Sequence, residues 1–315
     1  MALGVDGFRV GCWTHPAVPT GCTVVLAPAG ALGAAAVRGG APGTREVAAL
    51  SATSSIQQCH AVVLSGGSAF GLATAEGVVD WCVAAGIGYD KGVARVPIVG
   101  AAIVFDLREP GAPRPGRDAG YAACEAAGPG DPPQGAFGVG AGCLVGKTAG
   151  LEHAVPGGQG IGVARGGGVT VGALVAVNPL GDVLDERGSV LAGSRAPADA
   201  ARFPFGGPMV SATSATSAGP PALENTVIGC LVTDAQLTKP EAARAADLAH
   251  TGVARAVEPA HTTADGDVLF LLCAQRVPTS VDVVTALGAQ AVSAAIRAAV
   301  RAAAPTGLSG SAGLP

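Results

Sequence analysis

The chain has 315 residues, of which 49% are apolar and 13% are charged, and its formal net charge is −4. Charged residues make up ~25% of an average globular protein, so this composition excludes a disordered acidic or basic chain. The 19 lysines and arginines form no block of the kind that binds nucleic acid, and the 49 glycines follow no collagen period. The length fits about two domains of average size or one large domain.

Two further features bear on the cellular compartment. No two of the eight cysteines are closer than ten residues, which excludes C-x-x-C motifs and predicts buried, reduced thiols. The N-terminus lacks the basic and apolar regions of a signal peptide, and the long uncharged runs contain glycine, asparagine or proline, so none reads as a membrane span. We therefore expect a cytoplasmic protein with neither a membrane nor a nucleic-acid partner.

The first half of the chain alternates short apolar runs with glycine-rich turns. Apolar runs of strand length predict strands at 23–26, 61–64, 98–107 and 169–177. A stripe of apolar residues predicts a helix over 68–85, and a shorter helix is expected near 118–127. After residue 180 the pattern is that of a turn, a short strand and a hairpin whose turn contains Arg187 and Gly188.

The second half changes character at residues 193–224, where serine, alanine, proline, threonine and glycine dominate. A segment of this length without regular structure is usually functional or disordered, and we expect a mobile loop here. Order returns abruptly at Asn225, after which residues 226–233 predict a strand.

The C-terminal part begins with a helix-start signal. Thr238-Lys239-Pro240-Glu241 is a capping box with proline in the first turn, so we expect a helix from there to about residue 257. A strand at 268–273, a long helix at 280–304 and a frayed tail at 305–315 are expected to follow. Strands and helices mix without strict alternation, which predicts packed α and β layers, an α+β arrangement within the broad α/β class.

Residues 141–148, Ala-Gly-Cys-Leu-Val-Gly-Lys-Thr, nearly match the phosphate-binding motif G-x-x-x-x-G-K-[ST]. A working phosphate loop opens a helix whose N-terminus binds the phosphate, whereas here more glycines and Pro156 follow within a few residues. Nucleotide binding is therefore not expected. Lys147 remains of interest because it is one of only three lysines and lies in an apolar, glycine-rich turn; the alternative is a solvated lysine.

Ser68 lies in a sequence that suggests a nucleophile elbow, but Phe70 occupies the position of the second glycine of G-x-S-x-G. We favour a strand-to-helix turn in which Ser68 is the N-cap. The five histidines are scattered and form no H-E-x-x-H motif, which argues against a zinc protease. We expect His153, His250 and His261 to be structural or surface groups rather than ligands.

Two segments could carry hydrolytic chemistry. Asp265 and Asp267 flank a glycine just before an apolar run, so they form either an ordinary turn or a carboxylate pair that orients a nucleophile at a strand edge. At Asn225-Thr226 a low-complexity segment ends and a buried strand begins at a hydroxyl residue. Cleavage before Thr226 would give it a free α-amine, with a pKa near ~7.7–8.0, that can act as base for its own hydroxyl. The alternative is a threonine that simply begins a strand.

Four motifs occur together and in order, at residues 38–46, 64–72, 225–226 and 261–270. By these motifs the chain resembles, over nearly its whole length, the L-aminopeptidase/D-esterase family, which includes β-peptidyl aminopeptidases and nylon-oligomer hydrolases. The resemblance implies a single catalytic domain over residues 1–315 with a four-layer αββα fold. It also implies self-cleavage between Asn225 and Thr226 into a large chain, 1–225, and a small chain, 226–315, and a homo-oligomer, a tetramer of αβ units.

The same resemblance assigns roles to individual residues. Thr226 would be the N-terminal nucleophile, and Lys147 would tune or orient it. Asn178 would donate a hydrogen bond to the oxyanion. Asp265 and Asp267 would hold the hydroxyl and the amine of Thr226. No metal or organic cofactor is implied.

Two departures from the family pattern and one alternative bear on these roles. Phe105 stands where nylon-hydrolase members have a tyrosine at the catalytic site, so any role of that hydroxyl is lost. Val227 replaces the threonine that often follows the nucleophile, which alters the local polarity. For Asn178, which precedes a proline, the alternative is a plain Asn-Pro turn.

Together these features predict an autoprocessing hydrolase with an N-terminal threonine. Thr226 would attack an amide or ester carbonyl and form an acyl-enzyme that water then releases. The substrates would be small peptides, β-peptides, oligoamides or esters. Two rivals stay open, namely an acyltransferase of the ornithine-acetyltransferase type, which resembles this fold and uses an autoprocessed threonine, and a catalytically inactive binding homologue.

Overall fold

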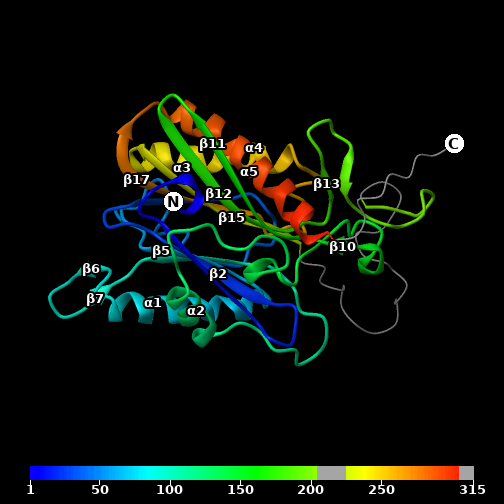
Figure 1. The fold of residues 1–315 in the computed structure, drawn as a ribbon, viewed down its shortest axis with the longest axis horizontal. Coiled ribbons are helices and arrows are strands. Elements are labelled where there is room, and N and C mark those ends of the chain that lie inside the picture. The colour runs from blue at the N-terminus through cyan, green and yellow to red at the C-terminus, as the bar shows by residue number, and fades with distance from the viewer. Residues whose placement is uncertain (204–224, 305–315) are drawn as a thin grey trace.

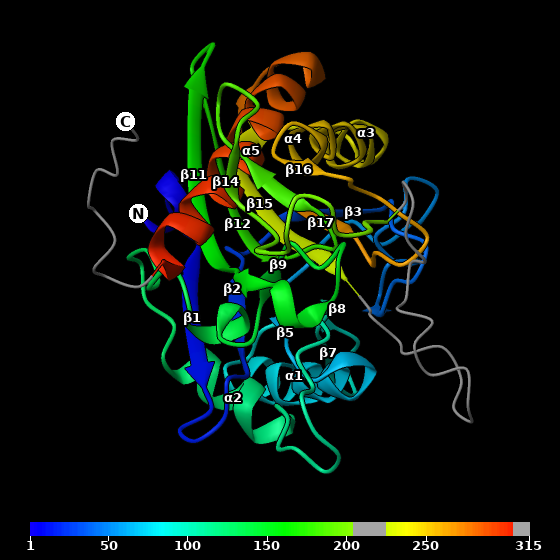
Figure 2. The ribbon, with the colours of Figure 1, turned by 90° about the vertical axis from the view of Figure 1, so that its right-hand side faces the viewer.

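Two β-sheets stack face to face between two layers of helices in the computed structural model, which describes residues 1–203 and 225–304. Figure 1 shows these layers edge-on, with helices along both outer faces. Figure 2, turned by 90°, shows the same succession of helices, sheet, sheet and helices. This four-layer αββα sandwich confirms the fold expected from the sequence.

The first sheet consists, in spatial order, of β1 (Arg9–Thr14), β2 (Gly21–Leu26), β5 (Ala61–Ser65), β8 (Val99–Ile103) and β4 (Thr44–Arg45). Its neighbouring strands pair antiparallel except β5 and β8, which run parallel. Two helices cover its outer face, α1 (Thr74–Ala84) and α2 (Arg117–Glu125). Small apolar side chains from the sheet and both helices form one core layer between them.

The second sheet consists, in spatial order, of β11 (Gly158–Gly166), β12 (Val169–Asn178), β15 (Thr226–Gln236), β17 (Val268–Pro278) and β3 (Leu32–Val37). Its strands pair antiparallel except β15 and β17, which run parallel. Its outer face is covered by α3 (Lys239–Ala249), α4 (Thr251–Ala254) and α5 (Val281–Ala303).

Shorter elements complete the described residues. Four are 3-10 turns, η1 (Ala2–Gly4), η2 (Ser68–Ala73), η3 (Gly138–Gly140) and η4 (Leu151–His153). The others are short strands, β6 (Tyr89–Asp90), β7 (Arg95–Val96), β9 (Leu144–Val145), β10 (Val155–Pro156), β13 (Asp182–Leu184), β14 (Val190–Ala192) and β16 (Val257–Glu258).

The alternation of side chains along β15 decides which way the start of this strand points. Ile228, Cys230 and Val232 face the first sheet and belong to the core between the two sheets. Val227 and Leu231 face the helix layer. Because successive side chains of a strand point to opposite faces, Thr226 faces the space between the sheets.

Glycines in β11 allow α5 to lie directly on the strand. A Cβ atom at Gly160 would come within 2.1 Å of the Ala295 carbonyl oxygen, and one at Gly162 within 2.1 Å of the Ala291 carbonyl oxygen. By length and composition α5 could cross a membrane, but 61% of its most apolar window is buried inside the protein. It is therefore a core helix of the sandwich.

Most expected elements are confirmed, some with different ends. The strands expected at 23–26, 61–64, 169–177, 226–233 and 268–273 correspond to β2, β5, β12, β15 and β17, and the strand expected at 98–107 is confined to β8. The short helix and the long C-terminal helix are α2 and α5, and β13 and β14 form the expected hairpin. The helix expected to run to 257 ends at Ala249 and resumes as α4.

Three expectations need correction or fall outside the structure. The helix expected over 68–85 begins as the 3-10 turn η2, and its cap is Gly67 in the left-handed region (φ 86°), so the N-cap role expected for Ser68 is wrong. The sequence did not predict β1, β3 or β11. Residues 204–224 of the loop expected at 193–224, and the whole tail expected at 305–315, lie outside the described residues.

Candidate active site

The candidate site lies where β12 ends and β15 begins. Asn178 and Thr226 are directly opposite in the antiparallel register, so their side chains share the face between the sheets. Both are buried, with relative exposures of 0% for Asn178 and 2% for Thr226. The structure therefore brings two of the predicted site residues together.

The Thr226 hydroxyl lies against the peptide bond that precedes it. Its Oγ1 donates to the carbonyl oxygen of Asn225 at 2.5 Å. The same oxygen accepts the backbone N–H of Gly266 at 2.7 Å. A Cβ atom at Gly266 would lie 3.1 Å from Thr226 Oγ1, so only a residue without a side chain leaves the hydroxyl undisturbed. The carbonyl of Asn225 is thus polarised by two donors while the nucleophile candidate touches it.

Lys147 reaches the same place from the turn after β9. Its Nζ donates to the Asn178 carbonyl oxygen at 2.8 Å and to Asn178 Oδ1 at 3.1 Å. The side chain is only 4% exposed, so the alternative of a solvated lysine is wrong. Burial lowers the pKa of this amine from 10.5 to about 7. Near neutral pH a large fraction of Lys147 is therefore uncharged, with both N–H groups on Asn178 and its lone pair available to accept a proton.

Asn178 is held by its side-chain amide as well as by the strand. Oδ1 also accepts the backbone N–H of Leu144 at 2.9 Å, and Nδ2 donates to the Phe105 carbonyl oxygen at 3.1 Å. Asn178 therefore ties the second sheet to the segment after β8. Donation to an oxyanion, the role that the family resemblance implies, would use the second N–H of Nδ2, since the Phe105 carbonyl takes only one of the two.

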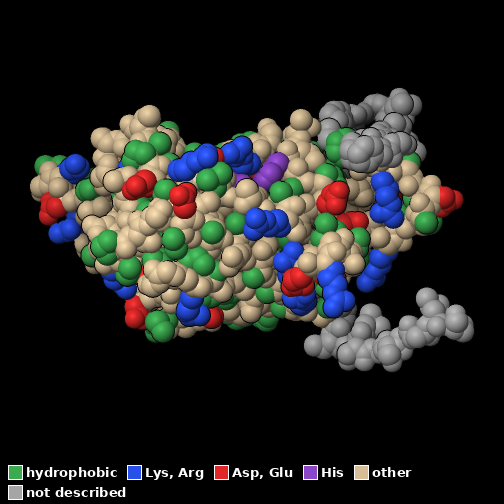
Figure 3. All heavy atoms as spheres, turned by 90° about the horizontal axis from the view of Figure 1, so that it is seen from above, with side chains coloured by type: hydrophobic (Ala, Val, Ile, Leu, Met, Phe, Trp, Pro, Cys, Tyr) green, Lys and Arg blue, Asp and Glu red, His purple; other side chains and the backbone are tan. Residues whose placement is uncertain are grey.

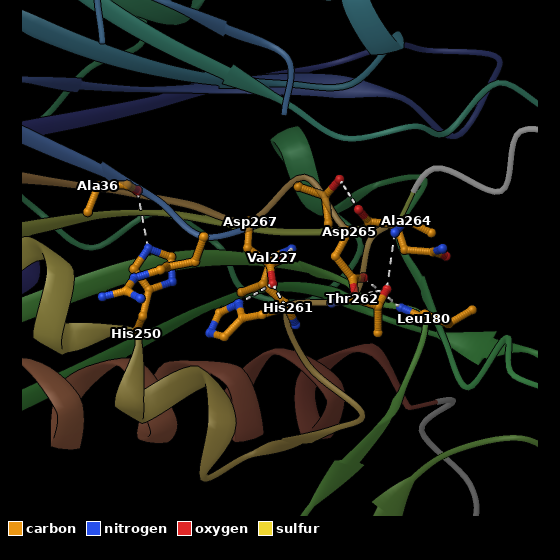
Figure 4. Close-up of polar contacts among 12 residues, drawn as sticks. Ala36, Leu180, Val227, His250, His261, Thr262, Ala264, Asp265 and Asp267 are labelled. Carbon is orange, nitrogen blue, oxygen red and sulfur yellow. Dashed lines mark hydrogen bonds and ion pairs between the residues drawn. The ribbon is translucent and has the colours of Figure 1, made fainter. Parts of the chain in front are cut away.

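Asp267 binds the backbone next to the nucleophile candidate. Its Oδ1 accepts the backbone N–H of Val227 at 2.6 Å. Its Oδ2 lies 2.6 Å from His261 Nδ1 and also accepts the His261 backbone N–H at 3.2 Å. Figure 4 shows Asp267 between His261 and Val227, with His250 on the far side of His261. Asp267 thus fixes the strand immediately after Thr226.

Asp265 has a different task from Asp267. Its Oδ2 accepts the backbone N–H of Thr262 at 2.8 Å and the Thr262 hydroxyl at 2.6 Å. Figure 4 shows Asp265 and Thr262 next to each other. Burial, followed by the nearby Asp267 charge, raises the pKa of Asp265. Its peptide unit pairs with Asn225, so Asp265 shapes the turn that carries Gly266 to the Asn225 carbonyl.

A glycine-rich segment after β3 supports this turn. The backbone of 38–41 donates to the carbonyl oxygens of Asp267 and Asp265. A Cβ atom at Gly39 would come within 2.2 Å of the Asp265 carbonyl oxygen. The close approach explains in physical terms why the segment needs glycine there.

Sequence reasoning missed His261 and His250 as members of the site. Their rings lie 5.0 Å apart, edge to face. Burial lowers the pKa of His250 to about 4. Burial is the largest single effect on His261 and opposes its charge, but the hydrogen bond to Asp267 and the nearby carboxylate charges together outweigh it and raise the pKa of His261. The only sequence signal was the position of His261 in the same short segment as the two carboxylates.

The remaining features of the site concern cofactors and charge. In residues 1–203 and 225–304 no three side chains of the metal-ligating types gather into a possible ion site. No helix opens at Lys147, where a phosphate loop would need one; the next element is the 3-10 turn η4. On the face shown in Figure 3, acidic and basic side chains are scattered rather than gathered into a field of one sign. The arrangement suits acyl chemistry, with a hydroxyl nucleophile, a buried amine and backbone donors on a carbonyl oxygen.

Comparisons with known proteins agree with this chemistry. The profile of Peptidase family S58 matches residues 3–310. An uncharacterized aminopeptidase of Mycobacterium tuberculosis is 41% identical over 88% of this chain and 83% of that protein. A 6-aminohexanoate-oligomer endohydrolase of Agromyces sp. is 31% identical over 88% of this chain and 76% of that protein.

Two solved structures share the fold. The β-aminopeptidase of Burkholderia sp. superposes with a TM-score of 0.64 at 20% identity, over 95% of this chain and 86% of that one. The L-aminopeptidase D-Ala-esterase/amidase of Ochrobactrum anthropi gives a TM-score of 0.65 at 20% identity, over 96% of this chain and 85% of that one. At this identity the likeness supports the fold alone.

Proposed function

The chain belongs to Peptidase family S58, and from this premise we propose that it hydrolyses peptide or amide bonds with Thr226 as a nucleophile that self-cleavage converts into an N-terminus. One observation carries the proposal. The Thr226 hydroxyl and the Gly266 N–H both contact the carbonyl oxygen of Asn225, at 2.5 Å and 2.7 Å. A buried backbone carbonyl with these two donors is prepared for attack by the neighbouring hydroxyl.

Self-cleavage would proceed as an acyl shift. Thr226 Oγ1 bonds to the carbonyl carbon of Asn225, and the negative charge that develops on the oxygen is stabilised by the Gly266 N–H. The C–N bond then breaks, and the nitrogen takes up the proton that the hydroxyl gave away. Before cleavage no α-amine is free, so Lys147, whose pKa is about 7, is our candidate for the base. Water hydrolyses the resulting ester and leaves a carboxylate on Asn225.

Substrate turnover would use the same hydroxyl with a new base. The freed α-amine of Thr226 takes the hydroxyl proton while Oγ1 attacks the substrate carbonyl, and it returns the proton to the leaving amine. Water then releases the acyl group by the same route in reverse. Asn178 is the candidate oxyanion donor at this stage, through the N–H of Nδ2 that does not bind the Phe105 carbonyl. An oxyanion donor of this kind contributes about 10²–10³-fold to kcat.

A substrate panel tests the proposal and separates the remaining candidates. It contains aminoacyl amides, β-aminoacyl amides, D-amino-acid esters and aminohexanoate oligomers, each incubated with the processed protein. Release of amine or acid from any of them supports the hydrolase. Acetyl transfer from acetylornithine to glutamate without hydrolysis would instead identify an acyltransferase, and a protein that neither cleaves itself nor acts on the panel would be a binding homologue.

The assembly is part of the same proposal. The family resemblance implies a homo-oligomer of processed units, four in number, and the low charge content of 13% leaves few charges to cover a monomer surface. Light scattering should therefore give a mass well above that of one chain. A stable particle of 30.3 kDa at micromolar concentration would refute the oligomer.

A further inference from the structure

His261 is a partly buried titratable group that the proposed mechanism does not use. Its side chain is 23% exposed, whereas that of Asp267 is 1% exposed. Nδ1 lies 2.6 Å from the Asp267 carboxylate, within the range of a charge-assisted hydrogen bond. His261 also has a left-handed backbone (φ 56°), a conformation that costs energy for a residue other than glycine or asparagine. A strained residue that places a donor on a buried carboxylate calls for a functional reason.

The contact continues from Asp267 to the nucleophile. While Oδ2 faces His261, Oδ1 accepts the N–H of Val227 at 2.6 Å. Val227 is bonded to Thr226, so this hydrogen bond fixes the position of the peptide unit that joins the two residues. The His261 ring contacts His250, at the end of α3, and so lies toward the helix layer, whereas the Thr226 hydroxyl faces the space between the sheets.

The other charged and titratable groups near His261 favour its role as a donor. His250, at the C-terminal end of α3, contacts the His261 ring, and its Nε2 donates to the Ala36 carbonyl oxygen. Its lowered pKa, due to burial, keeps it uncharged near neutral pH. Asp265 adds a second negative charge near His261, and Arg38 acts mainly on His250 and pairs with Asp247 at the surface.

We propose that His261 is a positioning residue, which holds the Asp267 carboxylate against the Val227 amide and so keeps Thr226 Oγ1 on the Asn225 carbonyl. The inference rests on the proposed function, because its effect is read in self-cleavage. It concerns a residue that touches neither the scissile bond nor a substrate. Without the His261 donor, the carboxylate is free to turn away from Val227, and the start of β15 loses its anchor.

Two substitutions at His261 separate the donor from the backbone. Asparagine and glycine both accept a left-handed φ, but only asparagine keeps an N–H donor near the position of Nδ1. We expect His261→Gly to slow self-cleavage roughly tenfold or more, as the loss of a hydrogen bond to a charged group predicts. His261→Asn should stay within about threefold of the wild type. The measurement is intact-mass spectrometry of the uncleaved fraction against time.

Further variants keep the test decisive. If His261→Gly does not fold, His261→Gln takes its place, since its amide lies near Nε2 and leaves Asp267 without the donor. In an Asp267→Asn background both changes at His261 should have no further effect, and His15→Asn, on the turn after β1, is the matched control. If the wild type cleaves at Asn225-Thr226 and His261→Gly or His261→Gln cleaves at the same rate, the positioning role of His261 is wrong. That outcome leaves the proposed function untouched. A wild type that never cleaves there overturns the proposed function instead.

Discussion

The two faces of the second sheet carry different polar clusters at the start of β15. On the face between the sheets, Asn178 lies opposite Thr226 and binds the Lys147 amine. On the helix-facing side, Asp267 and His261 hold the backbone of the next residue. The first cluster has the hydroxyl that we propose as the nucleophile and a buried amine of lowered pKa, and the second has a carboxylate bound to a backbone amide.

The difference suggests a division of labour across one strand. The inter-sheet cluster contains the groups that can exchange protons with the reacting atoms. The helix-side cluster contacts only the backbone and side chains that locate them. The two meet at the Asn225 carbonyl, where the Thr226 hydroxyl and the Gly266 amide converge. Substitutions on the first face should therefore abolish chemistry, and those on the second should slow it.

The largest expected effect is at Thr226. The wild type should consist of two chains, Met1–Asn225 and Thr226–Pro315, because the hydroxyl that attacks Asn225 also serves turnover. Thr226→Ala should remain a single chain of 30.3 kDa without activity, and Thr226→Ser should still cleave. Intact-mass spectrometry of the three proteins decides the matter. An active wild type found only as the intact chain, or cut elsewhere, would refute the mechanism.

A substitution of Lys147 is a second test of the role of the inter-sheet cluster. Lys147→Met should slow self-cleavage on the order of 10²–10⁴-fold, the usual contribution of a positioned base. Because the base is the uncharged amine, the wild-type rate should rise with pH and level off above about 7. The variant should lack this rise. A time course of cleavage from pH 5 to 9 measures both.

The control for Lys147 is Lys91→Met, since Lys91 is exposed on the β6–β7 turn. Its cleavage should match that of the wild type at every pH. If Lys147→Met also cleaves at the wild-type rate, the amine is not the base. The inter-sheet cluster then does not supply the proton acceptor that would distinguish it from the helix-side cluster.

Asp267 tests the helix-side face. Asp267→Asn should fold, because the amide oxygen can still accept the Val227 N–H, but it loses the charge that binds His261. A hydrogen bond to a charged group contributes about 1.5–3 kcal/mol, so turnover should fall roughly 10–100-fold. Steady-state kinetics on the best amide of the panel measures the loss. A fall as large as that of Thr226→Ala would instead place Asp267 among the groups that perform the chemistry.

The sequence predicted the elements that carry the site better than the contacts within it. The boundary between a low-complexity segment and a buried strand drew attention to Thr226, but only the family resemblance assigned it a role, since the pattern alone equally fits a threonine that begins a strand. The capping box of Thr238 and Glu241 is present at the start of α3 as expected. Both signals are local, since each depends on neighbours within a few residues.

Contacts between distant segments could not be predicted in this way. β11 was missed because Gly160 and Gly162 resemble a turn until the backbone of α5 is placed against them. His261 resembled a surface group because the sequence does not reveal that its segment turns back onto Asp267 or that His250, at the end of α3, packs against its ring. The two carboxylates also bind different partners, since Asp265 accepts from Thr262 and Asp267 from the Val227 amide, which spacing alone does not reveal.

The smallest expected effect is at Asp265. This carboxylate lies near Asp267 in the sequence but, in the part of the chain that the structure describes, has no hydrogen bond to Thr226 or Val227, so it separates the effect of a nearby charge from that of a direct contact. An asparagine can turn its oxygen toward Thr262 and keep both hydrogen bonds that shape the turn. Self-cleavage of Asp265→Asn should therefore stay within a few fold of the wild type. If Asp265→Asn and Asp267→Asn both keep near-full activity, the two residues form an ordinary turn and neither has a role in the reaction.

Asp265→Asn should show its effect in stability rather than in rate. Burial and the Asp267 charge raise the pKa of Asp265 above 3.8 in the folded protein, so the folded state binds this proton more tightly than the unfolded state does. The free energy of unfolding of the wild type therefore loses a contribution as the pH rises from about 4 through the raised pKa. The asparagine variant has no such proton, and its stability relative to the wild type should increase over the same pH range. Thermal unfolding of both proteins in the uncleaved Thr226→Ala background measures this difference, with Asp6→Asn at the exposed N-terminal turn as the control. A difference that stays constant with pH would mean that Asp265 ionises as easily in the folded protein as in the unfolded chain.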